Sequence, residues 1–237
     1  MKKAKFSHWL KQSLIFVSHG PWIWSGYTLF TGIILVLGRI SLALGIFLSV
    51  TCLFVGVGVA KYIDLKYSEE NPVGFYWAVN KSLPLAVLAA GTIVIFWFAF
   101  MVVANLITGE LYKIGQFFFF WELTPENLNN KSTREIANWI YSYSNVSLIF
   151  ALLMLTTFAS WFSYPLMLFK NYSWSEAIER GNQAVTRNKN AIYTMLGFIF
   201  VEAILCITVT PLVTPVLYML TSTMMYVSYK GIFEVSK

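Results

Sequence analysis

The sequence consists of long apolar runs separated by short polar or basic connections. Six of these runs contain about twenty residues with hardly any charge, the length that an α-helix needs to cross a hydrocarbon layer roughly 30 Å thick. Backbone groups in lipid must satisfy their own hydrogen bonds, so the runs are expected to be helical despite their β-branched residues. The pattern predicts an all-α polytopic membrane protein with six transmembrane helices, at residues 22–37, 40–60, 83–106, 146–169, 191–210 and 212–231.

Two of the connections are short enough to be tight turns. Gly38-Arg39 joins the first two runs, and the proline-containing segment 211–215 joins the last two. Each of these pairs is predicted to form an antiparallel helical hairpin. With the third and fourth runs as the middle pair, we expect three transmembrane hairpins in a single membrane domain over residues 1–237.

The composition excludes the common soluble classes. Hydrophobic residues make up 57% of the chain and charged residues only 12%, against about 25% charged residues in a typical soluble protein. A soluble enzyme, a disulfide-rich secreted domain and a disordered tail are therefore excluded. The net charge of +6 does not indicate nucleic-acid binding, because the basic residues are scattered among short connections and do not share one surface.

The basic residues predict the orientation of the spans, because lysine and arginine in short loops stay on the cytoplasmic side. One set of connections carries thirteen of them, and the opposite set carries four. With six spans, this asymmetry places both termini in the cytoplasm and residues 107–145 outside. The four residues on the outer side are Arg39, Lys113, Lys131 and Arg134.

Three stretches on the predicted cytoplasmic side, at residues 1–21, 61–82 and 170–190, resemble one another. The first and third have apolar residues at helical spacing along one face, and Ser173 precedes Glu176 at the spacing of an N-terminal capping box. We interpret all three as interfacial amphipathic helices, each preceding a transmembrane hairpin, so that the chain contains three copies of one unit. The alternative is that any short cytoplasmic loop is basic and somewhat amphipathic.

The extracytoplasmic insert at 107–145 has features of its own. It contains five consecutive aromatic residues at 117–121, which suit a membrane interface. Thr124-Pro125-Glu126 is typical of a helix start, and Ser132 with Glu135 forms a second capping-box pattern. Two interpretations of the insert stay open: a lid or docking surface, and a stiff connector that follows the membrane interface, which is the commoner case.

The residues available for catalysis or metal binding are few. The two histidines, His8 and His19, are eleven positions apart, which does not place them on one helix face as metal ligands. Cys52 and Cys206 are single thiols in different predicted spans, without a Cys-x-x-Cys motif. No phosphate-binding glycine loop, zinc-protease motif or nucleophile elbow occurs. The sequence therefore predicts no enzyme activity, no metal and no cofactor.

One acidic residue stands out, because Glu202 lies near the middle of the fifth predicted span. A carboxylate at that depth is costly and should face protein or water. It is a candidate proton or cation site, or a polar contact to a partner subunit, and the alternative is a neutral side chain bonded to a nearby hydroxyl. Asn105, near the outer end of the third predicted span, is a weaker candidate of the same kind.

The last third of the chain carries a set of motifs: a Trp-Phe-x-x-Pro span end, an asparagine at the entry to the next span, a proline-rich hairpin tip and a terminal Tyr-x-x-Tyr-Lys-x-Ile-Phe. They comprise Trp161, Phe162, Pro165, Asn188, Pro211, Pro215, Tyr226, Tyr229, Lys230, Ile232 and Phe233. Over residues 161–234 the chain thus resembles a bacterial family of six-helix inner-membrane proteins of unassigned function. The resemblance implies this architecture and a bacterial inner (plasma) membrane. The family pattern has no acidic residue at the position that corresponds to Glu202.

The leading functional hypothesis is a non-enzymatic inner-membrane scaffold or accessory subunit that acts by protein–protein and lipid contacts within a larger complex. The expected partners are membrane lipids and other integral membrane subunits, with no nucleic acid. The alternative is a small transporter or exporter component with Glu202 as an ion or proton site. A third hypothesis, an intramembrane enzyme acting on lipid, lacks a second ionisable residue at the depth of Glu202.

Overall fold

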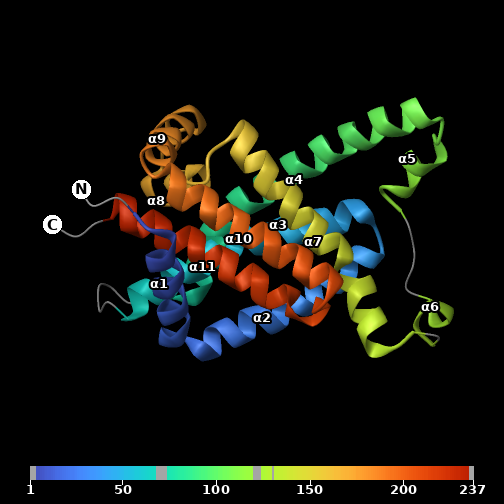
Figure 1. Ribbon diagram of the computed structural model, residues 1–237, viewed down its shortest axis with the longest axis horizontal. Helices are drawn as coiled ribbons and strands as arrows, with labels where there is room; N and C mark the ends of the chain where they lie inside the picture. The colour runs from blue at the N-terminus through green and yellow to red at the C-terminus, as the bar shows by residue number, and fades with distance from the viewer. Residues whose placement is uncertain (1–3, 68–73, 120–123, 130, 235–237) are drawn as a thin grey trace.

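A computed structural model describes residues 4–67, 74–119, 124–129 and 131–234, and all regular structure in them is helical (Figure 1). The helices are α1 (Phe6–His19), α2 (Pro21–Val36), η1 (Leu37–Arg39), α3 (Leu42–Tyr67), α4 (Phe75–Thr108), α5 (Tyr112–Gln116), α6 (Pro125–Asn129), α7 (Thr133–Phe158), α8 (Ser163–Lys170), α9 (Trp174–Arg187), α10 (Lys189–Thr208), η2 (Pro211–Val213) and α11 (Thr214–Phe233).

Within the described residues, five helices are long and apolar enough to cross a membrane: α2 with η1, α3, α4, α7 and α10. The all-α membrane architecture is thereby confirmed. The sixth predicted run forms α11, which is helical but less apolar than these five, because it carries serine, threonine and tyrosine along much of its length.

The polar character of α11 matches its place in the bundle, where α1, α2, α3 and α10 surround it (Figure 1) and thirteen of its twenty residues are buried. Its hydroxyls donate to backbone carbonyls: Ser222 Oγ to Leu53 O at 2.7 Å and Tyr218 Oη to Ser144 O at 2.6 Å. Between membrane helices, such small and polar residues allow close approach and hydrogen bonding. Of the six predicted spans, the least apolar one is thus the helix at the centre of the bundle.

The most extensive helix pairing joins α3 and α4 and uses small residues. Ala78, Ser82, Ala86 and Ala90 recur every fourth position on α4, and all four are buried. This stripe faces α3 at Gly58, where a Cβ atom would lie only 2.7 Å from the Cβ of Ser82. Because α4 packs along α3 and diverges from α7 (Figure 1), the predicted middle hairpin is not the main pairing of α4.

The fourth predicted span has other boundaries in the structure. Its helix, α7, starts at Thr133 with the predicted capping box of Ser132 and Glu135, and it ends at Phe158, before the predicted end at 169. A separate short helix, α8, follows after a break. Pro165 explains the break, because in a continuous helix its ring would clash with the carbonyl of residue 161.

Two of the three predicted cytoplasmic helices are present. They are α1 and α9, and the Ser173 side chain accepts a hydrogen bond from the backbone N–H of Glu176 as expected. The middle stretch, 61–82, is not a separate helix in the described residues, because α3 continues to Tyr67 and α4 begins at Phe75. Residues 61–67 contain no helix breaker and continue α3, and residues 75–82 form the start of α4, which holds Pro84 in its interior. Part of the middle copy, residues 68–73, lies outside the described residues, and the threefold repeat stays a prediction.

The segment that joins α4 to α7 packs back onto the bundle at Phe117. The backbone N–H of Ala43, at the start of α3, donates to the carbonyl of Phe117 at 3.0 Å, and the Phe117 ring is buried against Phe98 of α4. Thr124 caps α6 as predicted, accepting from the Asn127 N–H. Phe120 and Trp121, the end of the aromatic run, lie outside the described residues.

Candidate functional site: a lateral apolar cavity

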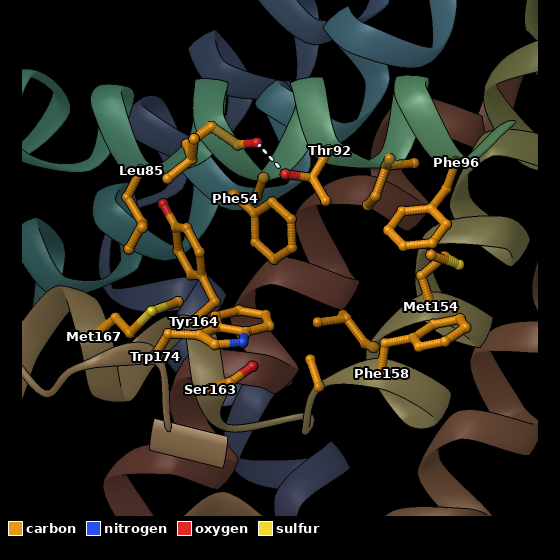
Figure 2. A pocket seen from close by; sticks show the side chains of 15 residues that line it. Phe54, Leu85, Thr92, Phe96, Met154, Phe158, Ser163, Tyr164, Met167 and Trp174 are labelled. Atoms are coloured by element: carbon orange, nitrogen blue, oxygen red, sulfur yellow. Dashed lines mark hydrogen bonds between the residues drawn. The ribbon is translucent and has the colours of Figure 1, made fainter. Parts of the chain in front are cut away.

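A cavity of about 550 Å³ lies between α4, α7 and α8, with α3 behind it and the start of α9 at its rim (Figure 2). Its walls are almost entirely apolar and aromatic. The lining residues are Phe54, Leu85, Leu88, Ala89, Thr92, Ile93, Phe96, Met154, Leu155, Phe158, Ala159, Ser163, Tyr164, Met167 and Trp174.

Aromatic contacts define two sides of this cavity. At the back, Tyr164 of α8 stacks on Phe54 of α3 with 4.2 Å between ring centroids. Toward the α5 end of α4, Phe96 stacks on Phe158 of α7 with 5.3 Å between ring centroids and forms that end of the cavity. The break before α8 makes this possible, because it turns Tyr164 inward between α3 and α4 (Figure 2).

The mouth of the cavity opens sideways between α4 and α7. Leu88 is 67%, Phe158 57% and Trp174 54% exposed. Because α4 and α7 are both candidate membrane spans, this opening lies within the layer that lipid tails would occupy.

The three hydroxyls in the cavity wall are already engaged with backbone carbonyls. Thr92 Oγ1 donates to Leu88 O at 2.9 Å, as Figure 2 shows. Ser163 Oγ donates to Ser160 O at 2.7 Å, and Tyr164 Oη donates to Ser82 O at 3.2 Å. Among the described residues, no carboxylate, thiol, imidazole or amine lines the cavity. The arrangement suits an apolar guest held by shape.

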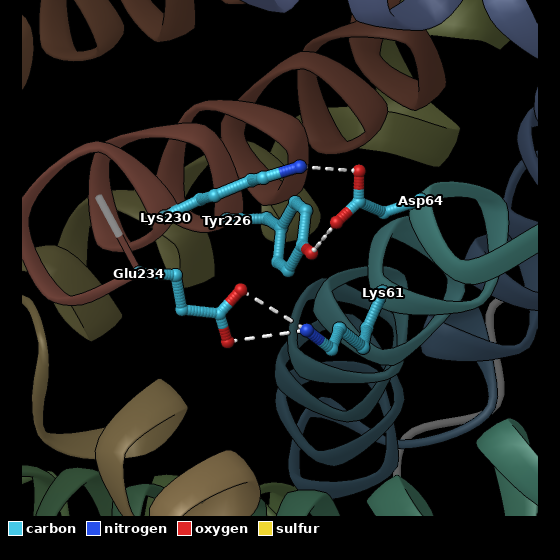
Figure 3. A network of polar contacts seen from close by, with 5 residues as sticks. All are labelled: Lys61, Asp64, Tyr226, Lys230 and Glu234. Atoms are coloured by element: carbon cyan, nitrogen blue, oxygen red, sulfur yellow. Dashed lines mark hydrogen bonds and ion pairs between the residues drawn. The ribbon is translucent and has the colours of Figure 1, made fainter. Parts of the chain in front are cut away.

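A polar network joins the C-terminal ends of α3 and α11 (Figure 3). Asp64 accepts from Tyr226 Oη and from Lys230 Nζ, both at 2.6 Å. One turn earlier, Lys61 Nζ lies 3.1 Å from both carboxylate oxygens of Glu234. These paired charges hold the ends of two helices together, and partial burial strengthens them relative to fully exposed ion pairs.

A smaller cavity of about 120 Å³ adjoins this network between α3, α4 and α8. Lys61, Lys81 and Glu234 line it, together with Trp77 and Leu168. The Lys81 ammonium lies 5.1 Å from the centre of the Trp77 ring, a cation–π distance. Unlike Lys61, Lys81 forms no ion pair with another described residue.

The structure places the two predicted polar candidates in different surroundings. Glu202 is partly buried on α10, and its carboxylate makes no hydrogen bond or ion pair with another described residue. Asn105 is buried, and its hydrogen bonds are local. Its side-chain Nδ2 donates to Met101 O at 2.8 Å. Its backbone carbonyl accepts from the backbone N–H groups of Gly109 and Glu110, where α4 ends. Neither residue lines the apolar cavity.

The cysteines and histidines are not brought together. Cys52 and Cys206 are buried free thiols on α3 and α10, and His8 and His19 are both exposed on α1. Across the described part of the chain, no group of three or more potential metal ligands occurs.

Arg39 has a role that sequence reasoning missed. It is only 4% exposed, its guanidinium lies 4.2 Å from the Tyr143 ring centroid and 4.7 Å from that of Trp139, and it donates to Ser142 Oγ at 2.7 Å. The Trp-x-x-Ser-Tyr order on α7 presents these groups on adjoining faces of one helix. A lone arginine in a two-residue turn, with aromatics in a neighbouring helix, is the signal that could have indicated it.

Comparisons with known proteins identify no relative of this chain. No protein-family model matches the chain, and neither a curated protein nor a solved structure matches it. The resemblance of residues 161–234 to a bacterial inner-membrane family therefore stays a prediction.

Proposed function

We propose that this protein is a non-enzymatic membrane scaffold or accessory subunit, which works by contacting lipid and other integral membrane subunits. The carrying observation is the poor burial of α4. In its most apolar stretch only 17% of the residues are buried, against 61% for α3. The proposed setting is a bacterial inner membrane with both termini in the cytoplasm, as the distribution of basic residues favours.

The outer half of α4 supports a protein contact. This half diverges from α7 (Figure 1) and is held by α3 and by the Phe117–Phe118 segment, which packs on Phe98. Membrane helices associate through packing and not through hydrophobic exclusion from water. A span with one packed face and an open angle to its neighbour offers a place where another subunit's helix can pack. The large exposed side chains there are Ile95, Phe100, Val103, Leu106 and Ile107.

The test is extraction of the native complex in mild detergent, followed by identification of stoichiometric partners. We expect membrane partners to co-purify with the unaltered chain and to be lost from Val103→Trp, which adds bulk on this face of α4. Val201→Trp is the matched control, since Val201 is a similarly exposed valine on α10. A protein that elutes alone, or a partner retained equally by both variants, would contradict the proposal.

A transporter or exporter component is the second candidate function, favoured by the unpaired state of the Glu202 carboxylate among the described residues. An ionisable group inside a span is a natural site for a proton or cation. If Glu202 serves this role, substrate-dependent flux in proteoliposomes is expected to fall by at least about tenfold in the Glu202→Gln variant, because the substitution removes the ionisable group. Unchanged flux in this variant would remove Glu202 from the mechanism.

A further inference from the structure

We propose that the lateral cavity binds one acyl chain of a membrane phospholipid, and that Lys81 binds the phosphate of the same molecule. This lipid site rests on the proposed function in one respect, since it specifies the lipid contact that the proposed function includes. It does not depend on a partner subunit.

The length of the cavity fits one lipid leaflet. On α4 its lining runs from Leu85 to Phe96, which at 1.5 Å per residue is roughly 16 Å. Half of a hydrocarbon core is about 15 Å thick. The Phe96–Phe158 stack closes the far end of the cavity. A single acyl chain entering from the nearer surface therefore fills the cavity and stops near the bilayer midplane.

The same closure argues against a transmembrane helix as the occupant of this cavity. A helix with side chains is about 10–12 Å across and must continue through both leaflets. The Phe96–Phe158 pair stands in its way, and a second aromatic contact follows directly, with Trp97 and Phe150 at 4.6 Å. An acyl chain is thin enough to end where these rings begin.

The lining also suits a hydrocarbon chain. Leucine, isoleucine, methionine and phenylalanine side chains form most of the wall, and the three lining hydroxyls already donate to carbonyls. Met154 and Met167 give it flexible surfaces that adapt to chains of different shape. Each CH₂ group contributes about 0.8 kcal/mol when it moves from water into such a cavity. A CH₂ group that comes from the bilayer is already in an apolar environment and gains no such free energy, so the acyl chain alone gives little selectivity.

Selectivity comes from charge at the headgroup end. Lys81 lies one helical turn before Leu85, so the two side chains share a face of α4. On α8, Met167 lines the apolar cavity and the adjacent Leu168 lines the smaller one that contains Lys81. An acyl chain seated in the first space thus brings its headgroup to the second.

Lys81 is the cation available to that headgroup. In the smaller cavity, Glu234 neutralises Lys61, whereas Lys81 has an aromatic ring beside it and no ion pair with a described residue. A lysine near a membrane surface attracts anionic lipid, and long basic side chains reach from a span toward the headgroup layer. One unpaired ammonium complements one phosphate.

The experiment measures phospholipid bound to the purified full chain by native mass spectrometry, and then by titration of delipidated protein with phosphatidylglycerol. We expect the unaltered protein to retain a phospholipid. Ala89→Trp, which fills the cavity, is expected to abolish retention. Lys81→Gln is expected to weaken the titration about fivefold, the effect of one lysine at an anionic surface, and Lys81→Arg to restore it.

Matched controls separate these effects from general damage. Ala104→Trp places the same bulk on α4 outside the cavity, and Lys11→Gln removes an exposed lysine on α1, so both are expected to bind phospholipid normally. Should Ala89→Trp not fold, Thr92→Trp at the exposed mouth is the second blocking variant.

Four outcomes would overturn the proposal. The first three are retention unchanged by the blocking variants, equal affinity of Lys81→Gln and the unaltered chain for phosphatidylglycerol, and a photo-crosslinker at position 89 that captures a protein segment in the membrane and not a lipid. Inorganic phosphate alone is expected not to compete, because it lacks the acyl chain, and effective competition by it would also contradict the proposal. Partner capture is measured on different variants, so failure of either proposal is recognised separately.

Discussion

A Gly56→Leu variant is expected to be strongly destabilised, by about 3 kcal/mol or more, because overpacking and broken hydrogen bonds act together. Gly56 lies on α3 where α2 and α11 meet it. A Cβ atom there would be 2.6 Å from the Tyr27 hydroxyl and 2.7 Å from the Cβ of Ser222. Neither neighbour can move freely, since Tyr27 Oη donates to Cys52 O at 2.8 Å and Ser222 Oγ to Leu53 O at 2.7 Å.

The measurement is the midpoint of unfolding of the purified protein in detergent, by heat or by added denaturing detergent. Gly91→Leu is the control. A Cβ atom at Gly91 on α4 would meet no described atom within 4 Å apart from the adjoining backbone of its own helix, and leucine has a better helix propensity than glycine. We expect the control to unfold at or above the midpoint of the unaltered chain. A Gly56→Leu protein as stable as the control would show that the three-helix contact is not as tight as described.

Replacing Trp161 with alanine is expected to destabilise the protein by about 3–5 kcal/mol, the usual range for removing a buried tryptophan. Trp161 is 1% exposed in the break between α7 and α8. Its Nε1–H donates to Ser228 Oγ of α11 at 2.9 Å, so the variant leaves a void beside the central helix. Because α8 carries Tyr164 into the cavity wall, the loss is also expected to loosen that wall.

The same unfolding measurement tests this expectation against two further variants. Trp161→Phe keeps most of the ring and loses the hydrogen bond, so it should cost only about 1–2 kcal/mol. Trp22→Ala removes a tryptophan that is 88% exposed and should leave the midpoint almost unchanged. Equal midpoints for Trp161→Ala and Trp22→Ala would refute the assignment of Trp161 to the core.

Much of the helical layout could be predicted from the sequence because it depends on local properties. The runs at 22–37 and 191–210 correspond closely to α2 and α10. The capping patterns of Ser132 and Ser173 mark the starts of α7 and α9. Apolar length and helix capping involve neighbours within a few residues, and lipid leaves the backbone no other regular structure for a single span.

Other boundaries could not be read from apolarity. The run at 146–169 looks continuous because Trp161, Phe162 and Tyr164 are as hydrophobic as a span, yet Pro165 and the packing of Trp161 against α11 divide it into two helices. Conversely, α3 and α4 extend beyond the predicted spans 40–60 and 83–106. Residues 61–67 contain no helix breaker, and α4 continues through Pro84, a residue that membrane helices tolerate.

The candidate site was least accessible to sequence reasoning. Glu202 attracts notice because a charge in a span is rare, but it does not line the cavity. Phe54, Tyr164 and Trp174, which help to enclose the cavity, look like ordinary lipid-facing or core aromatics in the sequence. They come from three helices, and Phe54 lies about 110 residues before the other two, so no spacing rule joins these positions.

By itself the sequence determined that this is an all-helical membrane protein, because burying the backbone in lipid is a local free-energy problem that each apolar run solves alone. The tertiary structure decided which helices pair, that the polar α11 lies at the centre and that a cavity opens beside α4. Those outcomes depend on how side chains distant in sequence fit together, such as Gly58 with Ser82 and Trp161 with Ser228. Shape complementarity of this kind appears only once the chain is folded.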